Sequence, residues 1–457
     1  MSQPDNISYT SIPAQYGRLI STHIPCPNVS LSQFLQLARG TERFYWESAH
    51  DNVAFAGIGV AVEIMGYGAD RFETVRHNAM ELFADSMVLD EQEAQATPRL
   101  FGGFSFRDDF IPDVAWSDFP PAHFVLPHYQ MTRVGDTTWL AINAHIPYGE
   151  APISLLPDLK EALRAKVAEL QTFTAKQKQT ITQTALDYPM PFETWKHNIE
   201  SATKRMKNGD FNKVVLSRVA EIRFDNYVDT DSALEFLDHT YPDTYRFLFE
   251  PRPYSAFYGA TPELLATVEG HNFTTMALAG SIQRGNTPEE DKQYGDELLN
   301  NPKDSYEHQV VIDGIQKRLT PLAETLDIGE TDIMTLSNIQ HLHTPISATL
   351  KRNDGILPIV EALHPTPALG GDPREIAMEV IGEYESVPRG WYAAPVGWID
   401  SNLDGQFGVA IRSAIAQEKR VWLYSGAGIV ADSDPVKEWD ETALKFVPML
   451  NALGINT

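Results

Sequence analysis

Two short segments of the sequence carry pairs of carboxylates three residues apart. Asp304 and Glu307 form one pair, and Glu438 and Glu441 form the other. Both segments are predicted to be helical, and residues three apart share one face of a helix. The two pairs could therefore converge on a hard cation such as Mg²⁺, which accepts one or two carboxylates and completes its octahedron with water and substrate oxygens. Spacing alone still favours a solvated helix face for each pair.

Lys213 and Glu263 are candidates for acid–base chemistry. Lys213 begins an apolar strand, and Glu263 lies in residues 259–265, Gly-Ala-Thr-Pro-Glu-Leu-Leu. A lysine and a glutamate at strand ends are commonly surface residues. If both face one cleft, burial favours their uncharged forms, an amine that accepts a proton and a carboxylic acid that donates one.

Three features could recognise an anionic ligand. Glycine-rich strand ends at residues 278–281 and 425–430 could hold a carboxylate on exposed backbone N–H groups, although glycines also serve tight turns. Arg412 is predicted to lie inside the apolar strand 408–414, where a guanidinium requires an acidic partner or an anionic ligand. Both alternatives stay open on the sequence alone.

Histidine, cysteine and glycine patterns narrow the chemistry further. Of the 13 histidines, His341 is the best placed for a site, whereas His343 is expected to be a structural histidine. Cys26 is the only cysteine, which excludes intrachain disulfides, thiolate metal clusters and Cys-x-x-Cys redox chemistry. The sequence has no zinc-ligand spacing, no Gly-x-Ser-x-Gly, no P-loop lysine and no G-x-G-x-x-G after a strand. Zinc, serine-hydrolase and nucleotide chemistry therefore lack motif support.

The composition narrows the class of partner. The 457 residues include 36 Lys and Arg against 62 Asp and Glu, a net charge of −26. This balance argues against nucleic acids, whose backbone requires basic patches, and against anionic membranes. Residues 1–18 lack a signal-peptide or transit-peptide pattern, and no apolar run is long enough to span a bilayer. A cytoplasmic protein is expected.

Strand and helix patterns predict how these residues are positioned. Pro189 and Pro191 mark the predicted boundary between an N-terminal half, 1–190, and a catalytic half, 191–457. The predicted strands are 43–48, 52–61, 99–106, 138–144, 213–218, 245–249, 264–268, 393–399, 408–414 and 421–425. The predicted helices are 70–89, 154–181, 192–206, 305–319, 374–384 and 435–447, the last ending before Pro448. Because strands and helices intermix without a regular βαβ order, the predicted class is α+β, one large domain with a mainly antiparallel sheet flanked by helices.

Seven strings of the catalytic half resemble the chorismate-utilising enzymes, the family of isochorismate, anthranilate, aminodeoxychorismate and salicylate synthases. In chain order they lie at 213–218, 259–265, 278–281, 303–308 (Lys-Asp-Ser-Tyr-Glu-His), 364–371 (His-Pro-Thr-Pro-Ala-Leu-Gly-Gly), 389–398 (Arg-Gly-Trp-Tyr-Ala-Ala-Pro-Val-Gly-Trp) and 425–445. Each string is weak alone, but seven in family order are specific. The N-terminal half matches only in general character, as the variable half of the same anthranilate synthase-like fold.

A few positions distinguish the reactions of this family. Lys213 stands where the members that use water have Lys and those that use ammonia have Gln. Ala368 stands where the ammonia users typically have Thr, and Ala279 stands where an aminodeoxychorismate synthase has a nucleophilic Lys. These positions resemble those of the isochorismate synthases. Ala277 and Ala394 depart from the usual Pro and Gly of the family, which affects the expected loop shape and removes no catalytic group.

The resemblance implies a role for each site residue. Lys213 is the implied base for water and Glu263 the implied acid for the departing C4 hydroxyl. Glu307 and Glu441 are the implied direct ligands of Mg²⁺, with Asp304 and Glu438 orienting its waters. The implied substrate-binding residues are Gly280, Ser281, His341, Ala368, Leu369, Tyr392, Arg412, Gly426 and Lys445. In this set the glycine segments lie at the ring carboxylate, and Arg412, Tyr392 and Lys445 hold the enolpyruvyl carboxylate. His341 and Leu369 shape the C4 side.

The implied activity is a Mg²⁺-dependent isomerisation of chorismate to isochorismate. The string 389–400 and the long N-terminal half resemble most the menaquinone-pathway members, with siderophore-linked members and salicylate synthase, which adds pyruvate release, as alternatives. A catalytically silent relative should have lost Lys213, Glu263 or a metal carboxylate, and all are present. No amidotransferase subunit is expected, and the chain is expected to be a monomer or a weak dimer.

Overall fold

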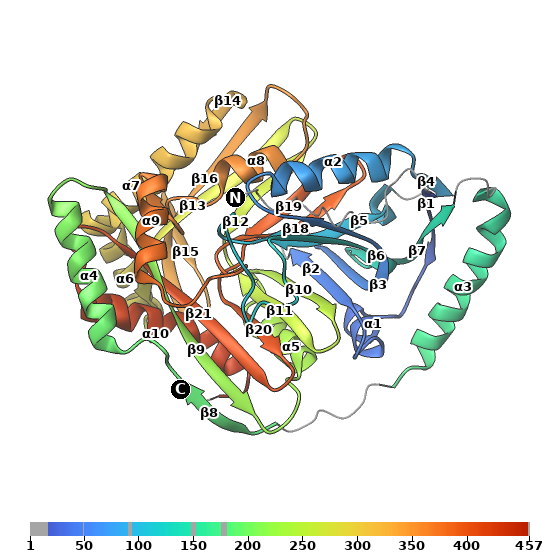
Figure 1. Ribbon diagram of the computed structural model, residues 1–457, viewed down its shortest axis with the longest axis horizontal. Helices are drawn as coiled ribbons and strands as arrows, with labels where there is room; N and C mark the ends of the chain where they lie inside the picture. Colours follow the sequence, from blue (N-terminus) through green and yellow to red (C-terminus); the bar gives the residue numbers. More distant parts are fainter. Residues whose placement is uncertain (1–16, 49, 90–93, 148–151, 175–180, 456–457) are drawn as a thin grey trace, which may run out of the picture.

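The computed structural model describes residues 17–455, apart from residue 49 and residues 90–93, 148–151 and 175–180. Within this described part, 21 strands form one connected hydrogen-bonded network, and helices cover its outer faces (Figure 1). The pairing of β1 (Gly17–Pro25) with β4 (Met87–Leu89) is parallel, and the other pairings recorded for these residues are antiparallel. The predicted α+β class with a large, mainly antiparallel sheet is confirmed.

Strand β6 (Ala122–Val134) is the branch point of the network. One of its edges pairs with β3 (Val53–Gly66) along its whole length. Its other edge pairs first with β5 (Arg99–Phe104) and then with β7 (Thr137–Pro147), which continues to β1. Because β6 is bordered by strands on both edges, two separate series of strands lead away from the N-terminal half.

The two series of strands are named here by the strand that each brings to the functional site. The β9 arm runs from β3 through β2 (Arg43–Ser48), β10 (Tyr245–Arg252), β11 (Ser255–Thr261), β20 (Ser413–Gln417) and β21 (Arg420–Ile429) to β9 (Lys213–Phe224). The outer edge of β9 carries β17 (Gly371–Asp372) and β8 (Gln183–Asp187). The β13 arm runs from β5 through β18 (Pro395–Asp400), β19 (Gly405–Val409) and β12 (Leu264–Glu269) to β13 (Asn272–Gln283) and β16 (Ile339–Leu350), which also pairs with β14 (Ala323–Ile328) and β15 (Asp332–Thr335).

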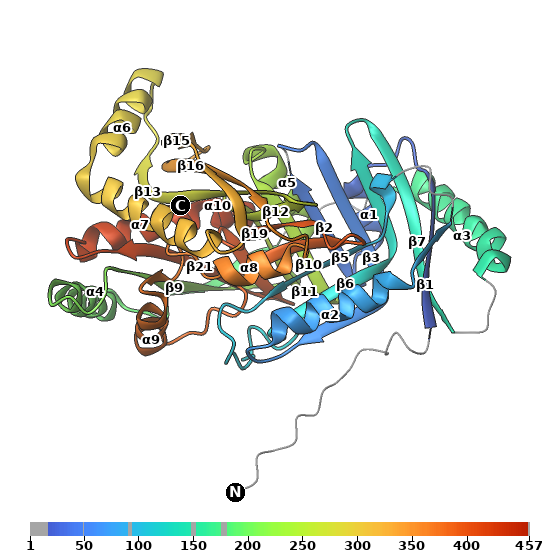
Figure 2. The same cartoon turned by 90° about the horizontal axis from the view of Figure 1, so that it is seen from above.

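Helices cover the arms and the N-terminal half. They are α1 (Leu31–Leu37), α2 (Arg71–Ala84), α3 (Pro152–Thr172), α4 (Phe192–Lys207), α5 (Thr230–Thr240), α6 (Pro288–Asn300), α7 (Pro302–Leu319), α8 (Leu357–Leu363), α9 (Arg374–Tyr384) and α10 (Pro435–Ala452), with a short 3₁₀ turn at Ala94–Ala96. Helix α7 packs on β13 and α10 packs on β21. In both views α3 lies at the end of the molecule opposite α4, α6 and α7 (Figures 1 and 2). No described helix is long and apolar enough to cross a membrane.

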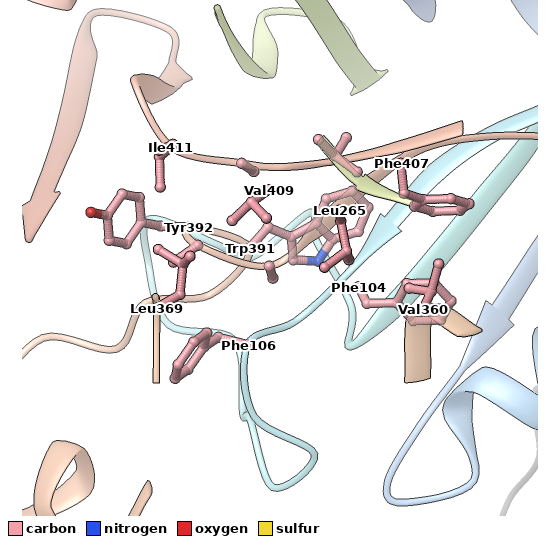
Figure 3. Packing of buried hydrophobic residues seen from close by; sticks show 14 of the residues in the cluster. Phe104, Phe106, Leu265, Val360, Leu369, Trp391, Tyr392, Phe407, Val409 and Ile411 are labelled. Carbon is pink, nitrogen blue, oxygen red and sulfur yellow. The ribbon is translucent and has the colours of Figure 1, made fainter. Parts of the chain in front are cut away.

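The largest buried apolar cluster joins the N-terminal half to the catalytic half. Phe104 of β5 packs on Phe407 of β19, and Trp391 lies within the same cluster. Figure 3 shows this cluster reaching Leu369, Tyr392 and Ile411 at one end. Together with the β2–β10 and β5–β18 pairings, this shared core links the two halves. The division at residue 190 stays a prediction.

Three predicted helices end several residues away from their predicted last residue. The helix predicted at 70–89 ends at Ala84, because Met87–Leu89 pairs with β1 as a strand. The helix predicted at 154–181 ends at Thr172, and residues 175–180 lie outside the described part. The helix predicted to end before Pro448 runs to Ala452. Phe446, Met449 and Leu450 are buried in one cluster with β20 and β21, so tertiary packing carries this helix past the proline.

The strand predicted at 408–414 is interrupted, and the prediction that Arg412 lies inside a strand was wrong. β19 ends at Val409 and β20 begins at Ser413. Between them Arg412 has a φ of 49°, a left-handed conformation that a strand cannot contain. The chain changes arms at this point, because β19 pairs with β12 whereas β20 pairs with β11. The break turns the Arg412 side chain into the functional site.

Candidate active site

A cavity lies where the β9 arm and the β13 arm meet. Its lining residues are Val215, Glu263, Leu278, Ala279, Gly280, Ser281, Glu307, His341, Ala368, Leu369, Tyr392, Ile411, Arg412, Gly426, Gly428, Glu441 and Lys445. A wider cleft adjoins it and shares Ser281 and Glu441 with it. Asp304 and Glu438 line that cleft rather than the cavity. Residues as far apart in the chain as Val215 and Lys445 thus reach one site, because both arms end there.

Lys213 is the first residue of β9 and is completely buried. Its Nζ lies 2.9 Å from Glu307 Oε1, although the two groups are not aligned as a hydrogen bond. Lys213 lies behind the cavity wall, next to Glu307 and Gly428. A Cβ on Gly428 would lie 2.2 Å from Glu307 Oε1 and 3.1 Å from Lys213 Cε, so only glycine leaves room for this ion pair.

Glu263 lies in the turn between β11 and β12, the point at which the chain passes from one arm to the other. Its backbone is fixed because its N–H donates to Thr261 Oγ1 and its carbonyl accepts from Val409 N. Burial raises the pKa of the Glu263 carboxyl to about 8, although nearby cations such as Lys213 and Arg412 act to lower it. The carboxyl is therefore mostly protonated at neutral pH and can donate a proton.

The four predicted carboxylates come from the N-terminal ends of α7 and α10, with Asp304 and Glu438 in the first turns and Glu307 and Glu441 in the next. Asn301 caps α7 by accepting from the N–H groups of Lys303 and Asp304, and Asp434 caps α10 in the same way. Both helices have a proline at the first position, which suits a helix start. These caps fix the directions of both helices, and with them the side chains of Asp304, Glu307, Glu438 and Glu441.

Burial and neighbouring charges shift the pKa of three of these carboxylates. Burial and the neighbouring Glu307 raise the pKa of Asp304 to about 6. Burial and the neighbouring Glu441 raise the pKa of Glu438 to about 7. Burial also acts to raise the pKa of Glu441, but Lys445 overcomes this effect and lowers it.

Lysines are the present counter-ions of three of these carboxylates. Lys303 Nζ lies 2.8 Å from Glu438 Oε1, Lys445 pairs with Glu441, and Lys213 pairs with Glu307. No three His, Cys, Asp or Glu side chains in the described chain converge closely enough to hold a metal as they stand. The donor set nevertheless fits Mg²⁺, because all four side chains are carboxylates, and the raised pKa values of Asp304 and Glu438 reflect a negative charge density that a divalent cation relieves.

Arg412 is the strongest candidate for binding an anion. It lines the cavity and is 9% exposed, and its side chain has no hydrogen bond or ion pair to any residue that the structure describes. Burial lowers the pKa of its guanidinium, against the effect of Tyr392 and two glutamates. Of the two alternatives left open by the sequence, a structural ion pair and an anionic ligand, this geometry favours the ligand. Tyr392 stacks on Tyr424 beside it, with ring centroids 5.1 Å apart.

The opposite wall of the cavity is shaped by a bulge in β13. The pairing with β16 shifts between Ala279 and Ser281, where Gly280 has a φ of 71°. His341 of β16 lies opposite Ser281, and its Nδ1 is 3.0 Å from the Gly280 carbonyl oxygen, so Nδ1 carries the proton. Burial lowers the pKa of His341 to about 3, which keeps the ring neutral. Its buried Nε2 has no partner within the described residues and is left as an acceptor.

The structure brings most of the predicted site residues together. Ala368 and Leu369 lie on the loop between α8 and β17, and Lys445 donates to the Gly426 carbonyl at 3.2 Å. Sequence reasoning missed Val215, Leu278, Ile411 and Gly428 as lining residues. Val215, Leu278 and Gly428 fall within strings that had already been noted, whereas Ile411 lies outside them, and nothing in the sequence separates the three apolar residues from the core.

A buried acid and an arginine without a side-chain partner among the described residues line one cavity, and a buried lysine lies directly behind its wall, an arrangement suited to an enzyme that acts on a small anionic molecule. The sequence profile of the family described as chorismate binding enzyme matches residues 9–454. The chain therefore belongs to the chorismate-binding enzyme family.

Named relatives agree with this assignment. The chain is 33% identical over 422 residues to isochorismate synthase MenF of Bacillus subtilis, which covers 90% of this chain and 88% of the relative. It is 35% identical over 419 residues to the salicylate biosynthesis isochorismate synthase of Pseudomonas aeruginosa, covering 91% and 86%. The solved structure of MenF, the menaquinone-specific isochorismate synthase from Escherichia coli, matches with a TM-score of 0.79 at 24% identity, covering 96% and 95%, which is a likeness of fold.

Proposed function

We propose that this protein is an isochorismate synthase, an isomerase that converts chorismate to isochorismate. The observation that carries the proposal is a mostly protonated Glu263, with a pKa of about 8, on the wall of a cavity that has Lys213 directly behind it. Relatives that bear this name, with coverage of nine tenths of the chain, support it.

The chemistry requires one proton to be taken and one to be given. Isochorismate differs from chorismate in having its hydroxyl at C2 instead of C4. Lys213, in its amine form, would accept a proton from the attacking water, and Glu263 would donate one to the departing C4 hydroxyl. Each positioned group of this kind contributes typically ~10²–10⁴-fold to the rate. The exchange is balanced, because one water enters and one leaves.

Charge at the site would orient the substrate. Chorismate carries two carboxylates, and Arg412, Tyr392 and Lys445 would hold the one on the enolpyruvyl group. The Gly280 and Gly426 segments would lie at the ring carboxylate. His341 Nε2, an acceptor, would face the hydroxyl side together with Leu369.

Glu307 and Glu441 would hold Mg²⁺ directly, with Asp304 and Glu438 bonded to its waters. When bound, the ion supplies positive charge that offsets the substrate carboxylate within an acidic pocket. The ion pairs of Lys213, Lys303 and Lys445 with three carboxylates would rearrange on binding.

The pathway that uses the product is a second part of the proposal. Menaquinone biosynthesis is supported by the similarity to MenF of Bacillus subtilis along most of both chains. Salicylate or siderophore formation is the alternative, supported by the comparable similarity to the Pseudomonas aeruginosa protein. A cytoplasmic location is proposed with either pathway.

Incubation with chorismate and Mg²⁺, followed by chromatography, tests the proposal. Isochorismate should form, and EDTA should stop its formation. Salicylate together with pyruvate would favour the alternative. Absence of all three products from folded, Mg²⁺-supplied protein would contradict the proposal.

A further inference from the structure

The outer edge of β9 has a gap in its strand pairing. Along its inner edge, β9 pairs with β21 from Val214 to Arg223. Along its outer edge, β17 covers Lys213 and Val214, and β8 resumes the pairing only at Glu221. The catalytic lysine therefore begins a strand that is held on one side by a partner of two residues.

The side chains of Glu385 and Arg389 fill the start of this gap. Arg389 Nη2 donates to the Val215 carbonyl at 2.8 Å, and the Ser217 N–H donates to Glu385 Oε1 at 2.7 Å. Just before them along the strand, the Val215 N–H donates to the Gly370 carbonyl at 2.9 Å. A guanidinium and a carboxylate thus provide the donor and the acceptor that a neighbouring strand would provide.

The same pair reaches other walls of the catalytic cavity. Arg389 Nη1 donates to the Leu369 carbonyl at 2.9 Å, and its backbone carbonyl accepts from Tyr392 N at 2.9 Å. Leu369, Tyr392 and Val215 all line the cavity. Phe106 lies 4.2 Å from the guanidinium carbon and closes its face, and Figure 3 shows it below Leu369 and Tyr392.

Two hydrogen bonds to Glu385 fix the orientation of the Arg389 guanidinium. Arg389 Nε and Nη2 donate to the two Glu385 oxygens at 2.9 and 2.6 Å, and both side chains are almost fully buried. A planar fork held on two oxygens directs its remaining N–H groups without further freedom. A lysine has one nitrogen and cannot reach the Val215 and Leu369 carbonyls together with both oxygens.

We propose that Glu385 and Arg389 are positioning residues for the reaction, joining the strand that begins with Lys213 to the Leu369 and Tyr392 walls of the cavity. They touch no reacting atom, and they act by fixing the distance between the base and the substrate walls. This inference rests on the proposed isochorismate synthase activity.

The test compares the variants R389K and E385Q with the wild-type protein and with a control variant, R43K. Arg43 is a matched control, because its side chain is 2% exposed, like that of Arg389, and is ion-paired with buried carboxylates (Asp231 and Glu250, against Glu385 alone for Arg389), but it does not line the cavity. Melting temperature, kcat and KM for chorismate would be measured for each protein. Amide hydrogen exchange of residues 213–217 gives a readout independent of turnover.

R389K should lower kcat by about ten- to a hundredfold, since a displacement of about 1 Å can cost ~10²-fold. KM should change less than kcat, because Arg412 and the Gly280 segment are not held by the pair. E385Q, which keeps an oxygen for the Ser217 N–H, should show a smaller loss. R43K should lose similar stability and keep its kcat, and only R389K and E385Q should speed exchange at 213–217.

Equal kcat values for R389K, E385Q and R43K, with unchanged exchange at 213–217, would overturn the inference. Wild-type protein that makes no isochorismate would contradict the proposed function instead. In that case faster exchange at 213–217 in R389K than in R43K would still support the positioning role, and equal exchange would refute it.

Discussion

Two buried groups of charges in this protein are built in opposite ways. In the Arg43 cluster, formed by Arg43, Asp231 and Glu250, the arginine contacts both carboxylates at 2.6 Å and also donates to Leu35 O and Thr230 Oγ1. In the catalytic cavity, Arg412 has no side-chain partner among the described residues, and Glu263 is neutral because burial outweighs the nearby cations. The first group is complete within the chain, whereas the second is complete only with a ligand.

The paired charges of the Arg43 cluster serve the stability of the fold, whereas the unpaired groups of the cavity serve the binding of a ligand. Buried charges that are fully paired hold β2, α5 and β10 together, and removing one leaves the others uncompensated. Buried polar groups left without partners cost stability and persist where a ligand meets them. The two groups should therefore respond in opposite ways to substitution.

The largest effect is expected from Lys213→Ala. Turnover should fall by about 10³–10⁴-fold, because the proton acceptor for water is lost. The affinity of this variant for chorismate, measured by titration or by equilibrium dialysis, should stay close to the wild-type value, because Arg412, Tyr392 and Lys445 remain. Near-normal turnover would show that Lys213 is not the base.

Glu263→Gln should lower turnover by about 10²–10⁴-fold for the corresponding loss of a proton donor. In wild-type protein, kcat/KM should fall as pH rises through about 8, where the carboxyl loses its proton. A pH–rate profile of wild type that continues level to pH 9.5 would contradict the assignment of Glu263 as the acid.

The raised pKa of Glu263 also predicts the direction in which the free energy of unfolding changes with pH. Its pKa is raised from 4.5 to about 8 in the folded state, so the folded protein binds more protons than the unfolded chain between these values. The free energy of unfolding of wild type should therefore fall, relative to that of Glu263→Gln, by roughly 2–5 kcal/mol from pH 4.5 to above pH 8. Urea denaturation of both proteins at pH 5 and pH 9 measures this difference, and a gain for wild type at pH 9 would have the wrong sign.

Arg43→Met and Arg412→Met compare the two groups directly. Arg43→Met should lower the free energy of unfolding by about 3–5 kcal/mol, because Glu250 stays buried without a cation and Asp231 keeps only Arg39, and should leave KM unchanged in protein that remains folded. Arg412→Met should change stability by less than about 1 kcal/mol and raise KM for chorismate. Equal losses of unfolding free energy in the two variants would show that the Arg43 cluster and the charges of the cavity do not differ in their contribution to stability.

The last expected effect is a rise of a few degrees in melting temperature when Mg²⁺ binds without substrate. Binding at 100 times Kd stabilises by about 2.7 kcal/mol, which raises the melting temperature by a few degrees for a chain of this size. Glu441→Gln should abolish the shift, whereas Glu221→Gln, on the far part of β9, should keep it. A shift of the same size in Glu441→Gln would place the ion elsewhere.

Local patterns in the sequence were sufficient for many of the helices and strands, whereas the roles proposed for the site residues came from the resemblance to a family. The helix predicted at 374–384 matches α9, and those predicted at 305–319 and 435–447 match the end of α7 and the start of α10, because helix start and stop signals lie within a few residues of the element. The carboxylate pairs follow from spacing on those helices. Their assignment to a metal required the collinear family strings, since solvated helices show the same spacing.

The rest depends on contacts between distant residues. The left-handed conformation of Arg412 arises where the chain changes arms, and nothing in its immediate neighbours signals it. Glu385 and Arg389 complete the edge of a strand about 170 positions earlier, through side chains that imitate a backbone. The placement of Lys213 behind Glu307, rather than on the cavity wall, likewise follows from how the two arms meet.

The most direct measurement of the central claim is the origin of the product hydroxyl. Wild-type protein would be incubated with chorismate and Mg²⁺ in H₂¹⁸O, and the product analysed by mass spectrometry. Water addition near Lys213 with loss of the C4 hydroxyl through Glu263 predicts isochorismate with one ¹⁸O at C2. Unlabelled isochorismate would show that the original hydroxyl migrates within the substrate, and would contradict the assigned roles of both residues.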